Sequence, residues 1–67
     1  MLDMLLLNGY KYNEKIKRYE KIKGNKEMYF DIYGEHVQVI KVINKNDIKL
    51  VNTISICRDN IEEYLSF

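Results

Sequence analysis

Hydrophobic and polar residues alternate along much of residues 28–57, and a period of two is typical of β-strands. Three segments, 28–32, 37–43 and 48–57, are rich in β-branched and aromatic residues. Polar turn residues separate them: Gly34-Glu35 suits a two-residue hairpin turn, and residues 44–47 suit a four-residue turn. The pattern therefore predicts three consecutive antiparallel strands.

The two turns fix strand registers that can be compared with each other. They pair Ile32 with Val37 and Ile43 with Ile48, and one sheet face then becomes almost entirely apolar, interrupted only by Lys41 and Asn52. Its apolar members are Met28, Phe30, Ile32, Val37, Val39, Ile43, Ile48, Leu50, Ile54 and Ile56. Because two separate turns agree on this face, we expect it to be the core face of a β-meander.

Residues 10–23 fit a strand or a helix, and the following turn decides between them. A two-residue turn at Gly24-Asn25 would put Lys17 and Lys21 on the core face. A three-residue turn at 24–26 places Ile22 opposite Met28 and directs the lysines outward. We therefore predict a strand with a three-residue turn, and keep the helix as the alternative.

Both ends of the chain carry helix signals. Leu2 to Leu7 predicts a short helix that stops at Asn8-Gly9, with Tyr10 packing back on the last turn. Asp59 or Asn60 can cap a second helix over Ile61–Leu65. The expected fold is α+β: a small antiparallel meander of about four strands, with a short N-terminal and a short C-terminal helix. Residues 1–67 suit one small domain.

Charge and composition narrow the class of protein. The net charge is +1 and the pI is about 7.8, below the values above about 9 that are typical of dedicated nucleic-acid binders. Residues 11–27 nevertheless carry seven Lys or Arg against three Glu. Cys57 is the only cysteine, and the longest apolar run, Met4 to Leu7, is too short for a membrane span. We expect a cytoplasmic protein without a membrane partner.

The sequence offers little for catalysis, and we expect no catalytic residues, no cofactor and no metal site. One histidine and one cysteine cannot build a multi-ligand metal centre. The predicted register places His36 opposite Ser55, with Cys57 as its diagonal neighbour, so a thiolate–imidazole pair is conceivable. A turn histidine beside a small apolar cysteine is the preferred interpretation. We expect that the protein is not an enzyme.

The face opposite the core mixes tyrosines with lysines in the predicted register, which pairs Tyr19 with Asp31, Lys21 with Tyr29 and Lys17 with Tyr33. If a terminal helix crosses this face, its tyrosines form a second small core. If it stays open, it can anchor a protein partner, because tyrosine offers a large rigid contact area. The expected partner-binding residues are Lys17, Tyr19, Lys21, Tyr29, Tyr33 and Ile40.

Lysines beside tyrosines also suit the binding of single-stranded nucleic acid, because bases can stack on the tyrosine rings while the lysines contact the phosphates. For that alternative the binding residues would be Lys11, Lys15, Lys17, Lys21 and Lys23. A third interpretation is a homodimer built through an exposed strand.

The leading hypothesis is a small binding protein that docks this sheet surface, or the sheet edge, on a protein partner. Lys, Ile and Asn dominate the composition, and Pro and Trp are absent. This bias suggests an accessory or inhibitor protein from a phage or mobile element of a low-GC bacterium.

Overall fold

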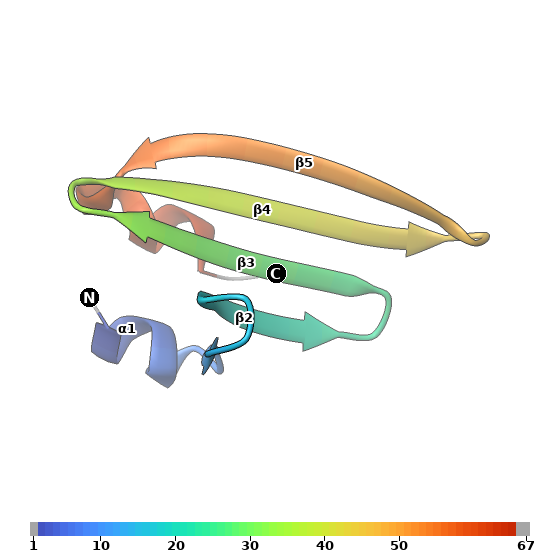
Figure 1. The fold of residues 1–67 in the computed structure, drawn as a ribbon, viewed down its shortest axis with the longest axis horizontal. Coiled ribbons are helices and arrows are strands. Elements are labelled where there is room, and N and C mark those ends of the chain that lie inside the picture. The colour runs from blue at the N-terminus through green and yellow to red at the C-terminus, as the bar shows by residue number, and fades with distance from the viewer. Residues whose placement is uncertain (1, 66–67) are drawn as a thin grey trace.

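The computed structural model describes residues 2–65, and the side chains of residues 3–65. Its elements follow the order α1 (Leu2–Leu7), β1 (Lys11–Asn13), β2 (Arg18–Lys23), β3 (Lys26–Tyr33), β4 (His36–Lys45), β5 (Ile48–Cys57) and the 3-10 helix η1 (Arg58–Tyr64). The strands form one antiparallel sheet in the order β1-β2-β3-β4-β5 (Figure 1). The α+β meander is confirmed, with one strand more than expected, because residues 14–17 form a turn within the predicted first strand.

Helix α1 ends where its sequence predicts. Gly9 has a φ of +86°, and its amide donates to the Leu6 carbonyl while the Tyr10 amide donates to the Leu5 carbonyl. These two bonds are the Schellman motif, which satisfies carbonyls that the helix end leaves unpaired. Tyr10 is thereby brought back onto the sheet, where its ring meets Phe30 edge to face at 5.0 Å.

The core lies between the sheet and the two terminal helices. Leu5 from α1 and Ile61 from η1 are buried against Phe30 and Val37. The Tyr10 hydroxyl donates to the Leu65 carbonyl at 3.2 Å, which ties the N-terminal segment to the end of the chain that the structure describes. We call this covered side of the sheet the helix-side face, and the other side the outer face.

The turn between β2 and β3 differs from the prediction. It has two residues, Gly24 and Asn25, and pairs Lys23 with Lys26 and Lys21 with Met28. Shortening a turn by one residue moves every side chain of β2 to the opposite face. Lys21 therefore lies on the helix-side face, and Ile22 is exposed on the outer face.

Lys21 tolerates this position because its ammonium need not be buried. The nitrogen lies 5.6 Å from the centre of the Tyr10 ring, and the side-chain carbons pass beside Gly9. The aliphatic stem can cover apolar surface while the charge stays at the rim of the sheet. The prediction that lysine is excluded from this face is wrong.

The second predicted turn is also shorter than expected. Asn46 and Asp47, both with positive φ, form a two-residue turn that pairs Lys45 with Ile48 and Ile43 with Leu50. The register is shifted by two residues, so each residue of β5 keeps its predicted face. The first hairpin, with its turn at Gly34-Glu35, has the predicted register.

The C-terminal helix begins earlier than predicted. It is a 3-10 helix that starts at Arg58, with Cys57 at the N-cap position and no side-chain cap hydrogen bond. The predicted cap at Asp59 or Asn60 is wrong, but Ile61 and Leu65 are buried in the core as expected.

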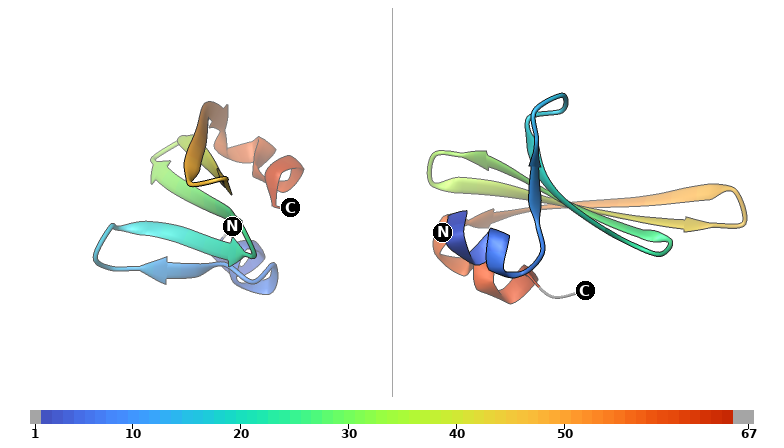
Figure 2. Two further views of the ribbon diagram at one scale, coloured as in Figure 1. Left: turned by 90° about the vertical axis from the view of Figure 1, so that its right-hand side faces the viewer. Right: turned by 90° about the horizontal axis from the view of Figure 1, so that it is seen from below.

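The two helices cover only one end of the sheet. Figure 2 shows both below the same face, near the Gly34-Glu35 turn, while the far part of the β4–β5 hairpin extends beyond them. No helix in the described residues is long and apolar enough to cross a membrane.

Candidate protein-docking surface on the β4–β5 hairpin

The predicted partner-binding residues do not form one cluster. Tyr29, Tyr33 and Ile40 share the outer face, in agreement with the predicted hairpin. Tyr19 and Lys21 lie on the helix-side face, because Tyr19 pairs with Phe30 and Lys21 with Met28. Lys17 belongs to the turn between β1 and β2, with a φ of 56°. The predicted mixed Tyr/Lys surface therefore does not form.

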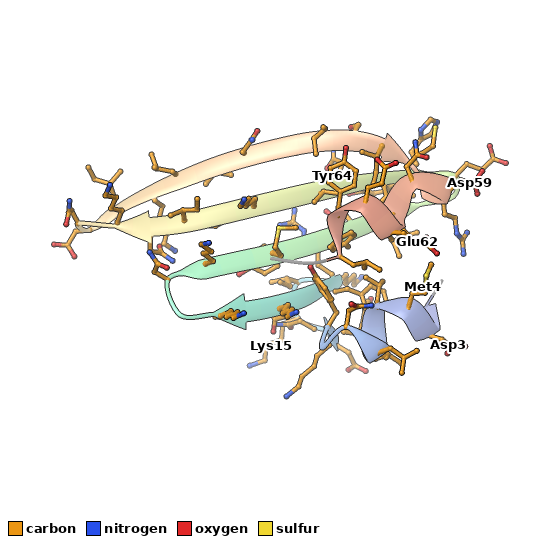
Figure 3. All side chains as sticks on the ribbon, turned by 180° about the vertical axis from the view of Figure 1, so that it is seen from behind. Asp3, Met4, Lys15, Asp59, Glu62 and Tyr64 are labelled. Atoms are coloured by element: carbon orange, nitrogen blue, oxygen red, sulfur yellow. The ribbon has the colours of Figure 1, made fainter. Side chains whose placement is uncertain are left out.

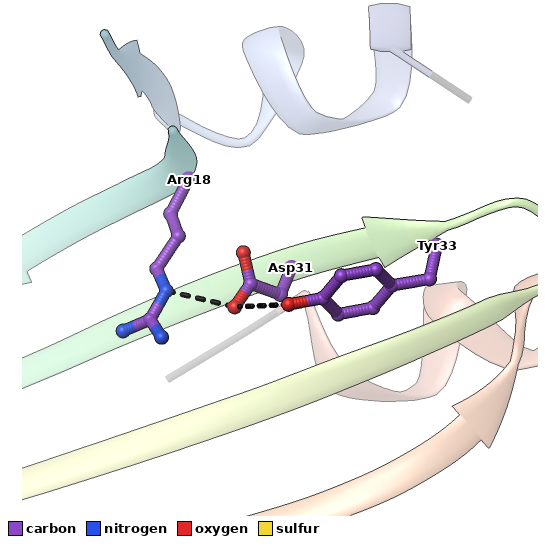
Figure 4. Close-up of polar contacts among 3 residues, drawn as sticks. All are labelled: Arg18, Asp31 and Tyr33. Atoms are coloured by element: carbon purple, nitrogen blue, oxygen red, sulfur yellow. Dashed lines mark hydrogen bonds and ion pairs between the residues drawn. The ribbon is translucent and has the colours of Figure 1, made fainter. Parts of the chain in front are cut away.

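No helix crosses the outer face of the described sheet, so its tyrosines are not a second core (Figure 2). Polar contacts hold the hydroxyls instead. The Tyr33 hydroxyl donates to Asp31 Oδ2 at 3.3 Å, and the same oxygen accepts from Arg18 Nε at 2.8 Å (Figure 4). The Tyr33 ring is exposed, whereas Asp31 retains only 6% of its surface.

Tyr29 belongs to a second polar cluster on this face. Its hydroxyl donates to the Glu27 carboxylate, and Asn44 Nδ2 donates to the other oxygen of Glu27 at 2.7 Å. These hydrogen bonds lower the pKa of Glu27 from its usual value of 4.5. The bond to the carboxylate, together with burial, raises the pKa of Tyr29 to about 12. The cluster fixes the start of β3 to β4.

Ile40, one of the residues expected to bind a partner, is buried. It retains 8% of its surface, and Val42 beside it is equally buried. No helix of residues 2–65 covers them, so neighbouring side chains on the outer face must do so. In the sheet, Ile40 lies between Tyr29 on β3 and Thr53 on β5.

Three of the five lysines proposed for nucleic-acid binding lie together. Lys11, Lys21 and Lys23 line a hollow of about 360 Å³ beside Gly9, and Glu20 and Ile22 complete it. The hollow lies along β2 beyond Lys11, the first residue of the short strand β1. Lys15 and Lys17 belong to the turn between β1 and β2. The structure thus brings together part of the predicted basic surface.

His36 and Cys57 are closer in register than predicted, because the shift of β5 places them directly opposite each other. They share a hollow of about 360 Å³ with Glu35, Arg58 and Asp59. No hydrogen bond that would make either residue a base or a nucleophile joins them among the described contacts. In the described residues, no group of three or more His, Cys, Asp or Glu side chains could hold a metal ion.

Exposed apolar side chains lie on the helix-side face of the β4–β5 hairpin, at the end of η1 and beyond it. Ile48, Leu50 and Ile54 expose 60%, 54% and 44% of their surface, and Ile43 is half-buried beside them. We call these four residues the distal patch. They belong to the apolar face that the sequence predicts as core, so their identity was expected and their exposure was not.

A hollow of about 400 Å³ adjoins the distal patch. It is lined by Met28, Val39, Lys41, Asn52, Thr53, Ile54, Glu63 and Tyr64. Figure 3 shows Tyr64 and Glu62 at the end of the sheet that the helices occupy. The hollow therefore lies where η1 stops and the open half of the hairpin begins. Because Asn52, Thr53 and Ile54 are consecutive, it reaches the backbone of β5.

Strand β5 also forms one of the two edges of the described sheet. All of its side chains except Ile56 are exposed. The Arg58 amide donates toward β4, to the Glu35 carbonyl at 2.8 Å. Since backbone groups alternate along a strand, even-numbered residues of β5 face β4, and Lys49, Val51, Thr53 and Ser55 direct N–H and C=O outward. These groups can pair with an added strand.

Comparison of the chain with family models, with curated proteins and with solved structures gives no match.

Element lengths could have revealed the distal patch from the sequence. A ten-residue strand such as β4 extends about 33 Å, whereas a seven-residue 3-10 helix extends about 14 Å and a six-residue α-helix about 9 Å. Helices of these lengths cannot cover the whole helix-side face of the hairpin. The longest dimension of the molecule, 35 Å, matches the long strands.

Proposed function

We propose that this chain is a non-enzymatic protein-binding module that docks its partner on the distal patch and along the edge of β5. One observation carries the proposal: Ile48 and Leu50, beside half-buried Ile43, are exposed at the end of the hairpin that the described helices do not cover, and Ile54 is exposed beside η1, across the polar pair Lys41 and Asn52. Monomeric proteins seldom leave large apolar side chains grouped in water in this way unless they bind something.

The free edge of β5 adds a second binding element to the apolar one. Strand addition supplies affinity through main-chain hydrogen bonds, and specificity through side chains that meet alternate residues. The hairpin offers both, because its outward-facing amides run beside Leu50 and Ile54. A partner that adds a strand here would also cover part of the distal patch.

The proposal can be tested with substitutions at one apolar residue of the patch and one apolar residue away from it. Leu50→Asn removes apolar contact on the helix-side face of β5, whereas Ile22→Asn makes a similar change at an exposed residue of β2 on the outer face. A tagged chain is incubated with nuclease-treated lysate of the native host and an untagged copy of the chain. Recovered proteins are quantified by mass spectrometry.

We expect at least about a tenfold loss of the recovered partner with Leu50→Asn, and recovery close to wild type with Ile22→Asn. Equal recovery with all three chains would exclude the distal patch as the docking surface.

A second candidate function is nucleic-acid binding, which the hollow lined by Lys11, Lys21 and Lys23 favours. Phosphate contacts by a few lysines should weaken roughly ten- to a thousandfold between 50 and 200 mM salt. Binding of a labelled single-stranded oligonucleotide, measured by fluorescence anisotropy at both salt concentrations, tests this candidate. A salt-independent signal, or none at 50 mM, would eliminate it.

We further propose that the module acts in the cytoplasm as an accessory or inhibitor protein, with a phage or mobile element of a low-GC bacterium as its source. Small size and the Lys, Ile and Asn bias support this part of the proposal.

A further inference from the structure

We infer that the occupant of the β5 edge is a second copy of this chain, paired antiparallel so that two sheets join into one. The inference rests on the proposed docking surface and names its partner. The edge can pair with the same edge of a second copy because every other residue offers an outward-facing N–H and C=O. These residues are Lys49, Val51, Thr53 and Ser55. Four residue pairs would give about eight backbone hydrogen bonds, two for each pair.

The charges of the hairpin and η1 favour the antiparallel direction. Residues 45–49, at the hairpin turn, carry Lys45 and Lys49 against Asp47, while η1 carries Asp59, Glu62 and Glu63 against Arg58. These segments lie at opposite ends of β5. Antiparallel pairing brings the basic hairpin end of each copy beside the acidic η1 of the other, and such complementarity selects the orientation of partners. Parallel pairing would set like charges side by side.

The side chains of β5 select one register. If Asn52 faces Asn52 of the second copy, Leu50 faces Ile54 and Ile48 faces Ile56 on the helix-side face. The outer face then pairs Val51 with Thr53 and Lys49 with Ser55, so no like charges stand opposite each other. A shift by two residues in either direction pairs Asn52 with Leu50 or Ile54, and an odd shift sets the helix-side faces on opposite sides of the sheet.

This register also brings the β5 residues of the distal patch into the interface. Leu50 of each copy lies beside Ile54 of the other, next to the hollow that Ile54, Glu63 and Tyr64 line. The pairing is isologous and uses the β5 edge of both copies, so the assembly closes at two. The remaining edge of each described sheet is formed by β1, which has only three residues, and by residues 21–23 of β2 beyond it. Short edge segments resist further association.

The two-fold axis at Asn52 permits a charge-exchange test. Asn52→Lys or Asn52→Asp places two like charges directly opposite each other, which is repulsive. A mixture of the two variants places Lys opposite Asp. Light scattering coupled to gel filtration gives the mass of each pure protein, and native mass spectrometry of the mixture resolves homodimers from heterodimers. The matched controls are Ile22→Lys and Ile22→Asp, at an exposed residue of β2 far from the β5 edge.

We expect the wild type to be a dimer. The dimer dissociation constant should be at least about tenfold higher for each Asn52 variant alone. Mixing the two Asn52 variants should give heterodimers, and the Ile22 variants should dimerise like the wild type. Circular dichroism confirms folding of each variant. As a second measurement on the wild type, the Val51 and Thr53 amides should become protected from exchange as concentration rises.

A wild-type monomer at about 1 mM overturns the second-copy inference. The proposed docking surface then survives if Leu50→Asn still abolishes capture of a foreign protein. The inference is also overturned if both Asn52 variants dimerise as tightly as the wild type, or if the two variants form no heterodimers on mixing. Either result would mean that the two-fold axis lies elsewhere.

Discussion

Asp31 is the most buried charged side chain among the described residues, and its two partners stabilise it unequally. Arg18 contributes a full charge at 2.8 Å, whereas the Tyr33 hydroxyl contributes a longer hydrogen bond of 3.3 Å. The Arg18 side chain keeps 38% of its surface, against 9% for Asp31. When one member of an ion pair is removed, the cost depends mainly on how well water can reach the other.

The pair should therefore respond asymmetrically to substitution. Arg18→Met leaves a poorly hydrated carboxylate with only Tyr33, and should lower the free energy of unfolding by about 1–3 kcal/mol. Asp31→Asn leaves an arginine that water can reach, and should cost about 1 kcal/mol or less. Urea unfolding followed by circular dichroism measures both. A larger loss for Asp31→Asn would contradict the burial argument.

Tyr10 links stability to pH in the alkaline range. Burial raises its pKa from 10.0 to about 12, so the unfolded chain loses this proton at lower pH than the folded chain does. The contribution of Tyr10 to the free energy of unfolding is therefore complete below pH 10. It is lost as pH rises from 10 through 12, by up to about 1.4 kcal/mol per pH unit. Tyr10→Phe cannot ionise and should decline less steeply with pH.

Urea midpoints of wild type and Tyr10→Phe between pH 8 and 12 provide the measurement. At pH 8 the variant should be about 0.5–1.5 kcal/mol less stable, because the hydroxyl no longer donates to the Leu65 carbonyl. Since lysines lose their charge in the same range in both proteins, only the difference between the two curves is informative. Parallel curves would show that Tyr10 ionises equally in the folded and unfolded chains.

At the scale of the elements, the turn at Asn46-Asp47 sets the register of the long hairpin. Both residues have positive φ, which a two-residue type I′ turn requires and which L-residues adopt at a cost. Asp47→Gly removes that cost at one position and should raise the free energy of unfolding by about 0.5–1 kcal/mol. Asp47→Val should lower it, since β-branched residues resist this conformation.

Thermal or urea unfolding of both variants tests the turn. The four-residue turn over residues 44–47 would not require positive φ at residue 47, so no gain from Asp47→Gly would favour that longer turn. Cross-strand nuclear Overhauser effects between Ile43 and Leu50 provide the control that the register is unchanged.

Periodicity predicted the strands well, whereas turn lengths were predicted less well, and the two errors had different consequences. The turn before β5 was overestimated by two residues, so Ile54 and Ile56 kept their predicted face. The turn before β3 was overestimated by one residue, which moved Lys21 and Ile22 to the wrong faces. The error arose because lysine was assumed to be excluded from the core face, although its stem can lie beside Gly9 with the ammonium near the Tyr10 ring.

The candidate site was less predictable than the fold. Sequence pattern identified Leu50 and Ile54 as apolar-face residues, but whether a helix covers them depends on where α1 and η1 dock. Tyr10 and Ile61 anchor both helices at one end of the sheet, and this tertiary placement has no local signature in the chain. The tyrosine surface was misassigned because the register of β2 was wrong, which moved Tyr19 and Lys21 to the helix-side face. Whether the outer face is open was left undecided by the sequence.

At the scale of the whole molecule, the sheet has two halves with different sources of stability. Near the Gly34-Glu35 turn, apolar side chains from α1, η1 and the sheet bury one another, with Phe30 and Val37 fully enclosed. Beyond the helices, the far end of the β4–β5 hairpin is held by main-chain pairing and by the contacts of Asn44 with Asn25 and Glu27. A two-stranded hairpin without a core is only marginally stable in water.

Amide hydrogen exchange should therefore be slow in the half of the sheet that the helices cover and faster in the uncovered half. At concentrations low enough to keep the chain monomeric, amides of Phe30 and Val39 should exchange only through global unfolding, whereas those of Lys45 and Leu50 should exchange through local opening, at least about a hundredfold faster. Exchange monitored by nuclear magnetic resonance at two denaturant concentrations separates the two routes, because only global opening is accelerated strongly by denaturant. Uniform protection along β4 would mean that the uncovered half is as stable as the covered one, and that the hairpin does not need a partner to order it.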